Sequence, residues 1–341
     1  MTTSATVVIP NWNGREFLEA CLASLRMQSF EDFGIVLVDN GSTDESVAFA
    51  NESFPEVEVI SLKRNEGFSA AVNAGIKASG SEYVALLNND TATDPGWLEA
   101  LVRSAESYPE AGFFASKLVD FHDRRFLDGA GDALRLGGLP YRLGHGEKDQ
   151  GQFDAPAYVF GACAAAALYR RALLEEAGLF DEDFVSYCED GDLSFRAQLA
   201  GYRCLYVPDA VVYHMGGAST GGKRSATATR LGTRNSLGLL VKNLPLSVVP
   251  HVLPFFVLAQ LTRLLTAAAT GTLRPHLEGL SEALRHLPVM LGKRHGIQAD
   301  KKLSDAEVRR LLRESSTAAA ASVARRIRDR TVRRISRSLA R

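Results

Sequence analysis

The first ninety residues alternate between short β-branched apolar runs and segments whose apolar residues recur at helical spacing. This alternation is typical of a parallel sheet flanked by helices. Ligands bind such sheets at the carboxyl ends of the strands. Each predicted strand ends in residues that suit ligand contact: Pro10-Asn11, Asp39-Asn40, Asn65 and Asp90. The predicted strands span 5–10, 35–38, 57–62 and 83–87, with helical segments at 15–28, from 42 or 43 onward, and at 69–78.

The run 83–87 stops abruptly at Asn88-Asn89-Asp90. A carboxylate at a sheet edge can hold a divalent cation, and the cation can neutralise a diphosphate. Alternatively, Asp90 is a turn residue or a helix cap before Pro95. The stretch alone leaves both interpretations open.

Several classes of protein are disfavoured. No GxGxxG follows the first strand, which argues against a dinucleotide fold, and no GxxxxGK[ST] indicates a P-loop NTPase. The net charge of −1 gives no reason to expect a nucleic-acid partner. The four cysteines show no CxxC spacing, so free thiols in a reducing compartment are expected. The N-terminus lacks the pattern of a signal peptide, so we expect a cytoplasmic protein.

The middle of the chain continues the α/β pattern with one long interruption. A helix is predicted at 97–107 and a strand at 112–119. Residues 121–154 are rich in glycine and charge, and a loop of this length is usually functional or mobile. Glu189-Asp190-Gly191-Asp192 opens a helix that runs to about Ala200. Further predictions are one strand or two short strands at 158–169, a helix at 170–177, strands at 204–207 and 211–214, and a flexible loop from Gly216 to about Thr229.

The last hundred residues read as helices. A helix is predicted from Arg230 towards Leu244, and Arg230 or Arg234 contacts a phosphate or solvent. Residues 246–269 are the most apolar stretch, but prolines and polar residues interrupt it. We therefore expect a helix that lies in a membrane interface or packs on the rest of the protein, rather than one that spans a bilayer. Two amphipathic helices follow at 277–291 and 303–312, and the arginine-rich tail binds anionic lipid or is a disordered, solvated segment.

Five blocks in this order resemble the inverting family 2 glycosyltransferases of the GT-A fold, within their bacterial rhamnosyltransferase-like branch. The resemblance covers about residues 5–240. The blocks are Val7 to Gly14, Val36 to Asp44, Asn65 to Phe68 with Asn73 to Gly75, Leu86 to Asp90, and Glu189 to Leu193 followed by Tyr206 to Pro208 and His214.

This resemblance implies a site for a nucleoside diphosphate sugar. Asp39 accepts from the N3–H of a uracil or thymine ring, and Pro10 and Asn11 line the base pocket. Asn65 and Asn73 frame the ribose and diphosphate, or only tie their loop. Asp39, in turn, could be only a helix cap. The other residues assigned to the nucleotide by their blocks are Asn13, Gly67, Asn88 and Asn89.

The resemblance also implies a metal and a base. Asp90 is the last residue of a DxD-type motif that here lacks its first aspartate, and His214 supplies a second protein ligand to Mn²⁺ or Mg²⁺. A histidine ligand favours Mn²⁺. Asp190 is the expected catalytic base, kept ionised by the helix N-terminus. Asp192 is the second candidate for the base, although we expect it rather to cap or orient the helix, and Glu189 is the third. Alternatively, all three acids are a capping cluster.

Together these observations predict an α/β protein with a GT-A mixed sheet flanked by helices and a C-terminal helical extension. The catalytic domain spans 1–240, with a nucleotide-binding half at 1–120 and an acceptor or catalytic half at 121–240. Residues 241–341 form a partly amphipathic extension with a basic tail, and 246–341 could meet the inner face of the cell membrane. The expected activity moves a sugar, rhamnose first among the candidates, from a dTDP- or UDP-sugar to a glycan or lipid-linked glycan in cell-surface polysaccharide synthesis. A nucleotidyltransferase, a silent nucleotide-sugar-binding module and a homodimer are left open.

Overall fold

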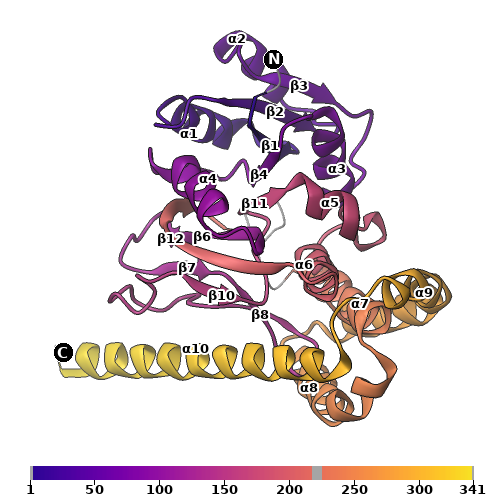
Figure 1. The fold of residues 1–341 in the computed structure, drawn as a ribbon. Helices are drawn as coiled ribbons and strands as arrows, with labels where there is room; N and C mark the ends of the chain where they lie inside the picture. Colours follow the sequence, from indigo (N-terminus) through magenta and orange to yellow (C-terminus); the bar gives the residue numbers. More distant parts are fainter. Residues whose placement is uncertain (1–2, 217–224, 340–341) are drawn as a thin grey trace.

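A mixed sheet of ten strands forms the centre of the computed structural model, which describes residues 3–216 and 225–339, with side chains up to residue 329. Its main path runs β10-β12-β6-β11-β4-β1-β2-β3, with β5 added on β12 and β7 on β6 (Figure 1). The expected mixed sheet flanked by helices is therefore confirmed. The strands are β1 (Ala5–Asn11), β2 (Phe33–Asp39), β3 (Glu58–Ser61), β4 (Tyr83–Leu87), β5 (Thr91–Thr93), β6 (Ala111–Asp120), β7 (Leu127–Ala130), β10 (Ala157–Val159), β11 (Ala166–Arg170) and β12 (Arg203–His214).

The four strands of the first ninety residues pair in parallel, so their carboxyl ends meet at one edge. Antiparallel β11 lies between β4 and β6 and joins this unit to the second half of the sheet. Apolar faces of three helices pack on each side of the sheet and give it two separate hydrophobic cores (Figure 1). One side carries α1 (Arg15–Arg26), α2 (Ser46–Ser53) and α4 (Trp97–Ser107), and the other carries α3 (Phe68–Ala78), α5 (Arg171–Ala177) and α6 (Glu189–Leu199).

Three predicted elements differ from the structure. The expected loop at 121–154 contains β7 and the hairpin of β8 (Asp132–Leu134) and β9 (Pro140–Arg142), which are too short to show a periodic pattern. The two strands predicted at 204–207 and 211–214 are one strand, β12, because both halves pair with β6 across a register shift. The second helix begins at Ser46, later than expected, where the Asp44 carboxylate accepts from the Ser46 N–H.

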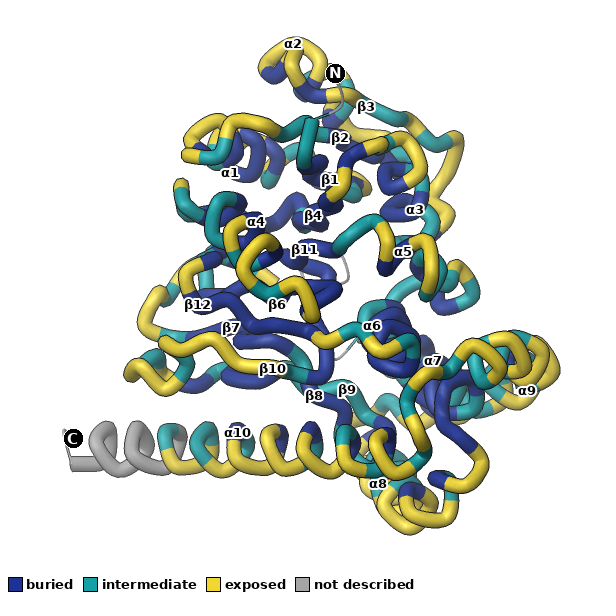
Figure 2. The backbone as a smooth tube through the Cα atoms, viewed as in Figure 1, coloured by how far each residue is buried: buried dark blue, intermediate teal, exposed yellow. Residues whose placement is uncertain are grey.

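Four helices and a 3₁₀ turn form the C-terminal region, and a third hydrophobic cluster joins them to α6. The 246–269 helix is long and apolar enough to cross a membrane by length and composition alone, and only 11% of its apolar window is buried. Much of α8 and α9 is exposed (Figure 2). Residues 217–224 of the predicted loop and 340–341 of the basic tail lie outside the described residues. The loop prediction is wrong from Ala226, where α7 begins, and the helix predicted at 303–312 continues to Leu339, so the described part of the tail is helical. The helices are α7 (Ala226–Asn243), α8 (Val249–Ala269), α9 (Leu273–Ala299) and α10 (Asp305–Leu339), with the 3₁₀ turn at Leu246–Val248.

Candidate active site

The carboxyl ends of β1, β2 and β4 meet at a chain of three buried side chains, Asn11, Asp39 and Asn89. The Asn11 amide donates to Asp39 Oδ1 over 3.1 Å, and the Asn11 oxygen accepts from the Asn89 amide over 2.7 Å. The other Asp39 oxygen accepts from the Ser42 N–H over 3.0 Å. Asp39 thus stands at the expected sheet edge. Its contact with the Ser42 N–H closes a turn and does not cap a helix, because the next helix begins only at Ser46.

Gly14 allows this amide chain to form beside the turn that follows β1. A Cβ atom at Gly14 would lie 2.1 Å from the Asn89 amide nitrogen and 2.6 Å from the Asn11 oxygen. The neighbouring Asn13 adopts a positive φ of 47° and accepts from the Thr43 N–H over 2.8 Å. The turn is therefore tied to the segment that follows β2, and both lie at the edge expected to receive a nucleotide.

Asn65 and Asn73 are held by different parts of the protein. The Asn65 oxygen accepts from the Gly67 N–H over 2.9 Å and from the Asn40 amide over 3.1 Å, so it shapes the loop before α3. The buried Asn73 amide donates to Phe180 O and its oxygen accepts from the Phe180 N–H. These contacts favour the loop-tying alternative for Asn73, because its amide already has partners of the chain.

The residues predicted to bind metal come together where β4 and β12 end. His214 Nε2 lies 3.3 Å from Asp90 Oδ1, and each side chain is 6% exposed. Apart from each other, neither atom has a hydrogen-bond partner among the described residues. The buried Oδ1 atom of Asn88, two residues before Asp90, also lacks a partner there. A buried polar atom without a partner is costly, and a divalent cation would satisfy both opposed atoms. This carboxylate and imidazole therefore fit the expected metal.

Asp128 on β7 supports His214 from behind, a role that the sequence interpretation did not assign. Asp128 Oδ2 accepts from His214 Nδ1 over 2.7 Å and from Arg142 Nη1 over 2.7 Å. With Nδ1 donating, the neutral ring carries its lone pair on Nε2, the atom that faces Asp90. Burial raises the pKa of Asp128, but Arg142, His145 and His214 outweigh burial and hold that pKa low. The signal in the sequence was the pair of acids in Asp128-Gly129-Ala130-Gly131-Asp132, inside a loop expected to be functional.

Glu189 and Asp190 open α6, and a Glu189 oxygen is also buried without a hydrogen-bond partner. Asp190 Oδ1 accepts from the Gly191 N–H over 2.7 Å. Burial raises the pKa of Asp190, and the positive charge of Arg142 opposes this rise in part. Burial and the charge of Asp190 raise the pKa of Glu189 to about 8. We expected the helix N-terminus to keep Asp190 ionised, but burial outweighs that contribution to its pKa.

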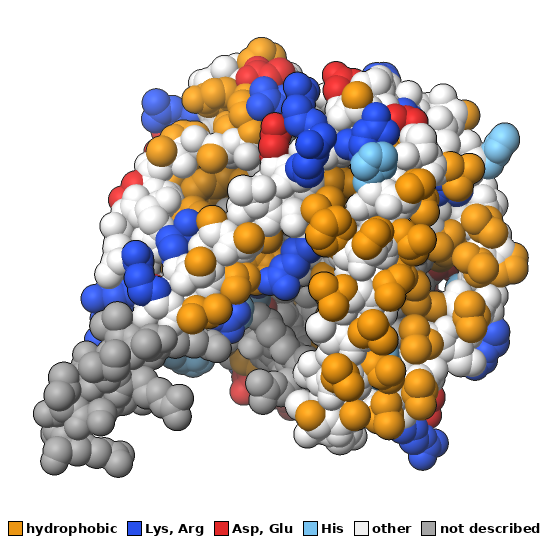
Figure 3. All heavy atoms as spheres, turned by 90° about the horizontal axis from the view of Figure 1, so that it is seen from below, with side chains coloured by type: hydrophobic (Ala, Val, Ile, Leu, Met, Phe, Trp, Pro, Cys, Tyr) orange, Lys and Arg blue, Asp and Glu red, His pale blue; other side chains and the backbone are white. Residues whose placement is uncertain are grey.

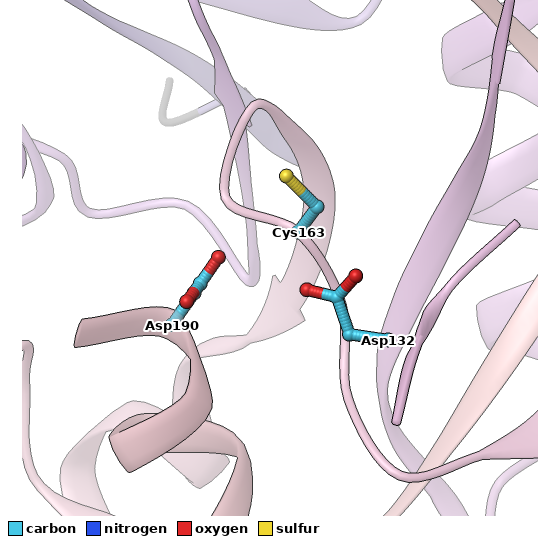
Figure 4. Close-up of side chains that lie close together, drawn as sticks. All are labelled: Asp132, Cys163 and Asp190. Atoms are coloured by element: carbon cyan, nitrogen blue, oxygen red, sulfur yellow. The ribbon is translucent and has the colours of Figure 1, made fainter. Parts of the chain in front are cut away.

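Asp132, Cys163 and Asp190 point toward one another (Figure 4), and their ligand atoms lie within 4.8 Å. The Arg142 guanidinium reaches into this cluster, donating to Cys163 Sγ and lying 3.8 Å from an Asp132 oxygen. Burial also raises the pKa of the Cys163 thiol, which keeps it protonated and a poor ligand. Because the Arg142 guanidinium already serves this cluster, Asp90 and His214 fit a metal better than these three residues do.

Asp192 has a structural role. Its side chain is fully buried and accepts from Arg196 Nε over 2.9 Å, Lys242 Nζ over 2.8 Å and the Asn243 amide over 2.8 Å. Burial raises the pKa of Asp192, but Lys242 and Arg196 outweigh burial and lower it. The carboxylate therefore anchors α7 to α6, a role that differs from the expected capping of α6, and it is too buried to meet a substrate hydroxyl.

The loop before Glu189 is strained and is held by α7. Val185, Tyr187 and Cys188 adopt positive φ angles of 63°, 69° and 69°, which non-glycine residues rarely adopt. The Asn235 amide nitrogen lies within 2.8 Å of the carbonyl oxygens of residues 184, 186 and 187. Arg234 donates to the carbonyl oxygens of residues 183 and 184, so it serves the loop rather than solvent or a phosphate.

The mixed sheet carries a buried carboxylate and imidazole at its strand ends and a pair of acids at the start of α6, an arrangement that suits a nucleotide-sugar site. Residues 6–178, half of the chain, match the family described as "Glycosyl transferase family 2". The chain therefore belongs to glycosyl transferase family 2 and is a glycosyltransferase.

A relative and two solved structures refine this placement. Over 246 residues the chain is 29% identical to an N-acetylglucosaminyl-diphospho-decaprenol L-rhamnosyltransferase of Mycobacterium tuberculosis, covering 65% of this chain and 79% of the relative. This relative supports the expected rhamnosyltransferase-like branch. GalNAc-T7 with UDP, GalNAc and Mn²⁺ aligns at TM-score 0.58 and 18% identity over 71% of this chain and 48% of that one. S. aureus TarS 1-349 aligns at TM-score 0.55 and 18% identity over 92% and 91%, so both structures share the fold.

Proposed function

We propose that this enzyme transfers rhamnose, with inversion, from a dTDP- or UDP-sugar to a hydroxyl of a lipid-linked glycan in cell-surface polysaccharide synthesis. The observation that carries the proposal is the pair of buried, opposed atoms Asp90 Oδ1 and His214 Nε2, which fits a metal at the carboxyl end of β4. The rhamnosyl and lipid-linked parts rest on the relative's name.

In this mechanism the chain binds the donor at the edge formed by β1, β2 and β4. Asp39 and Asn11 contact the base, and Asn88 and Asn89 lie towards the diphosphate. Asp90 and His214 would hold Mn²⁺ or Mg²⁺, which would supply positive charge against the diphosphate. Asp128 keeps His214 in the tautomer that leaves Nε2 open to a ligand.

Asp190 acts as general base in a single displacement. It takes the proton of the acceptor hydroxyl while the hydroxyl oxygen bonds to the anomeric carbon from the face opposite the leaving group. The bond from that carbon to the nucleoside diphosphate breaks, so no covalent enzyme intermediate forms. Because burial raises the pKa of Asp190, its carboxylate accepts a proton more readily than an exposed one.

We also propose that α8 places the enzyme on the inner face of the cell membrane. Hydrophobic side chains gather over the helical end of the molecule that carries α8 and α9 (Figure 3). The side chains of Leu258, Leu261 and Leu265 on α8 are 61%, 53% and 70% exposed. A helix with such a face lies in the interface of a bilayer, where a lipid-linked acceptor is found.

The direct test measures nucleoside diphosphate release and sugar transfer from dTDP-rhamnose, UDP-sugars and GDP-sugars, with Mn²⁺, Mg²⁺ or EDTA. The acceptor is an N-acetylglucosaminyl-diphospho-lipid. We expect metal-dependent transfer from dTDP-rhamnose, with the opposite anomeric configuration in the product. Transfer that persists in EDTA, or a retained configuration, would contradict the proposal.

A further inference from the structure

A pocket of about 350 Å³ lies between α7, α8 and the turn that leads into α9. Threonines from all three segments line it together with Arg263 and His276, and no acidic residue does. Its lining residues are Ala228, Thr229, Thr262, Arg263, Thr266, Ala267, Thr270, Thr272 and His276.

Arg263 lacks a counter-charge in this pocket. Its Nη1 donates to Ser236 Oγ over 2.7 Å and its Nη2 to Thr233 Oγ1 over 2.9 Å, and both acceptors are neutral. No carboxylate of the described chain pairs with it, and every Asp and Glu of the sequence lies among the described side chains. Arg263 is partly buried, and burial lowers its pKa. Removing a cation from water without supplying an anion is costly. An anionic ligand would relieve this cost.

The groups around Arg263 are held in one hydrogen-bonded cluster. The hydroxyl of buried Thr233 donates to Thr229 O over 2.8 Å, so it accepts from Arg263. His276 Nδ1 lies 3.0 Å from the same hydroxyl oxygen and must donate to it, because the single hydroxyl proton is already used. His276 is 2% exposed, so the cluster is built into the fold rather than formed by surface side chains.

Charge and position both favour an amphiphilic anion as the ligand. The sequence from Ala210 to Leu277 contains no Asp or Glu but seven Lys and Arg residues. The helix that carries Arg263 also exposes Leu261 and Leu265, so a polar anion site and an apolar face share α8.

We propose that this pocket binds the phosphate or diphosphate group of a lipid, with Arg263 as counter-charge and the lipid chain along α8. The guanidinium and the surrounding hydroxyls suit phosphate oxygens. Identifying this lipid as the acceptor rests on the proposed function. The anion site itself does not, because it follows from the unpaired guanidinium and its pocket.

The first experiment uses inorganic phosphate and pyrophosphate as probes, with EDTA present to suppress metal-dependent binding at the donor site. Thermal unfolding and the NMR ring resonances of His276 are followed in wild type, Arg263→Met and Arg274→Ala. Arg274 is the matched control, because its side chain is 91% exposed and pairs with Glu278 on the surface of the same helix. We expect phosphate to raise the Tm and shift the His276 resonances in wild type and Arg274→Ala, but not in Arg263→Met.

Without phosphate, Arg263→Met should unfold at the same or a higher temperature than wild type, because the substitution removes a partly buried charge that no carboxylate balances. A phosphate response that persists in Arg263→Met, or one that is lost equally in Arg274→Ala, would overturn the proposal. Arg263→Lys keeps the charge and should retain a weaker response, which separates loss of charge from loss of folding.

The second experiment identifies the source of the phosphate. If the ligand is the acceptor, Arg263→Met should raise the KM for a short-chain diphospho-lipid acceptor at least tenfold and leave the donor KM unchanged. If the ligand is a membrane headgroup, binding to phosphatidylglycerol vesicles should fall while both KM values stay constant. If wild type shows the phosphate response but no sugar transfer, the proposed function is refuted and the anion site is retained. If Arg263→Met changes neither the acceptor KM nor vesicle binding, the lipid assignment is refuted.

Discussion

At the scale of single residues, Asn235 holds the strained loop that precedes Glu189. Three carbonyl oxygens converge on its buried amide nitrogen, directly before the helix that begins with Glu189 and Asp190. We expect Asn235→Ala to cost about 1–3 kcal/mol of stability, because buried carbonyls lose their donor. Turnover should fall more than nucleotide affinity.

Urea unfolding and steady-state kinetics check this prediction. Asn51→Ala is the control, because Asn51 is exposed on α2, and its stability should change by less than about 0.5 kcal/mol. An Asn235→Ala enzyme with wild-type stability and turnover would show that the loop holds its shape without this amide.

Glu189 gives a prediction of pH dependence. Its pKa is about 8 in the folded protein, against 4.5 ordinarily, so the folded state binds a proton that the unfolded state releases between these values. Its contribution to stability is therefore complete below about pH 4.5 and is lost as the pH rises to about 8. Glu189→Gln should become more stable relative to wild type across this window, by up to about 1.4 kcal/mol per pH unit. Unfolding free energies that stay parallel from pH 5 to 8 would show that Glu189 is already ionised.

Some residues of the candidate site were marked by a local sequence pattern, and others depend on contacts with residues far away in the sequence. Asp90 follows the apolar strand β4 and Glu189 and Asp190 open an acidic helix, so local patterns singled out their positions. His214 is the last residue of β12, and only the family resemblance singled it out. Asp128 and Arg142 lie on strands too short to have a period. Asn235 acts on a loop about fifty residues earlier in the chain, and no local pattern reports such a contact. Asp192 has the same local signature as Asp190, and its partners Lys242 and Asn243, which lie far away in sequence, separate the two environments.

At the scale of elements, α10 holds the segment that carries Asp128 and Arg142. Its Ser315 and Ser322 hydroxyls accept from the Leu134 and Gly144 N–H groups over 2.7 and 3.0 Å. Buried Glu147 in turn accepts from Arg325 Nε over 2.7 Å. These partners are far apart in sequence, which explains why residues 121–154 resembled a loop while the four N-terminal strands, each defined by its own composition, were predicted correctly.

Truncation tests this role of α10. A chain that ends at residue 313 should lose activity roughly 10²-fold, because a small displacement of Asp128 or Arg142 misplaces the groups that they hold. A chain that ends at residue 329 keeps the contacts above and should remain active. The transfer assay compares the two, and equal activities would show that the β8–β9 segment keeps its place without α10.

At the scale of the whole molecule, the exposed apolar face of α8 lies at the opposite end from α1 (Figure 1). The double substitution Leu258→Glu and Leu261→Glu should reduce co-sedimentation with phosphatidylglycerol vesicles at least tenfold, because it adds two charges to the face proposed to enter the interface. Met27→Glu is the control, since Met27 is 68% exposed at the far end. Equal loss in Met27→Glu, or none in the double variant, would contradict a membrane contact through α8.

The central claim is that Asp190 is the base of a metal-dependent sugar transfer. The most direct measurement compares wild type with Asp190→Asn for transfer to the lipid-linked acceptor at saturating donor and Mn²⁺, with nucleotide affinity measured in parallel. The account predicts a fall in kcat of about 10²–10⁴-fold and an unchanged nucleotide Kd. A turnover within about threefold of wild type, where a base would account for far more, would contradict the assignment.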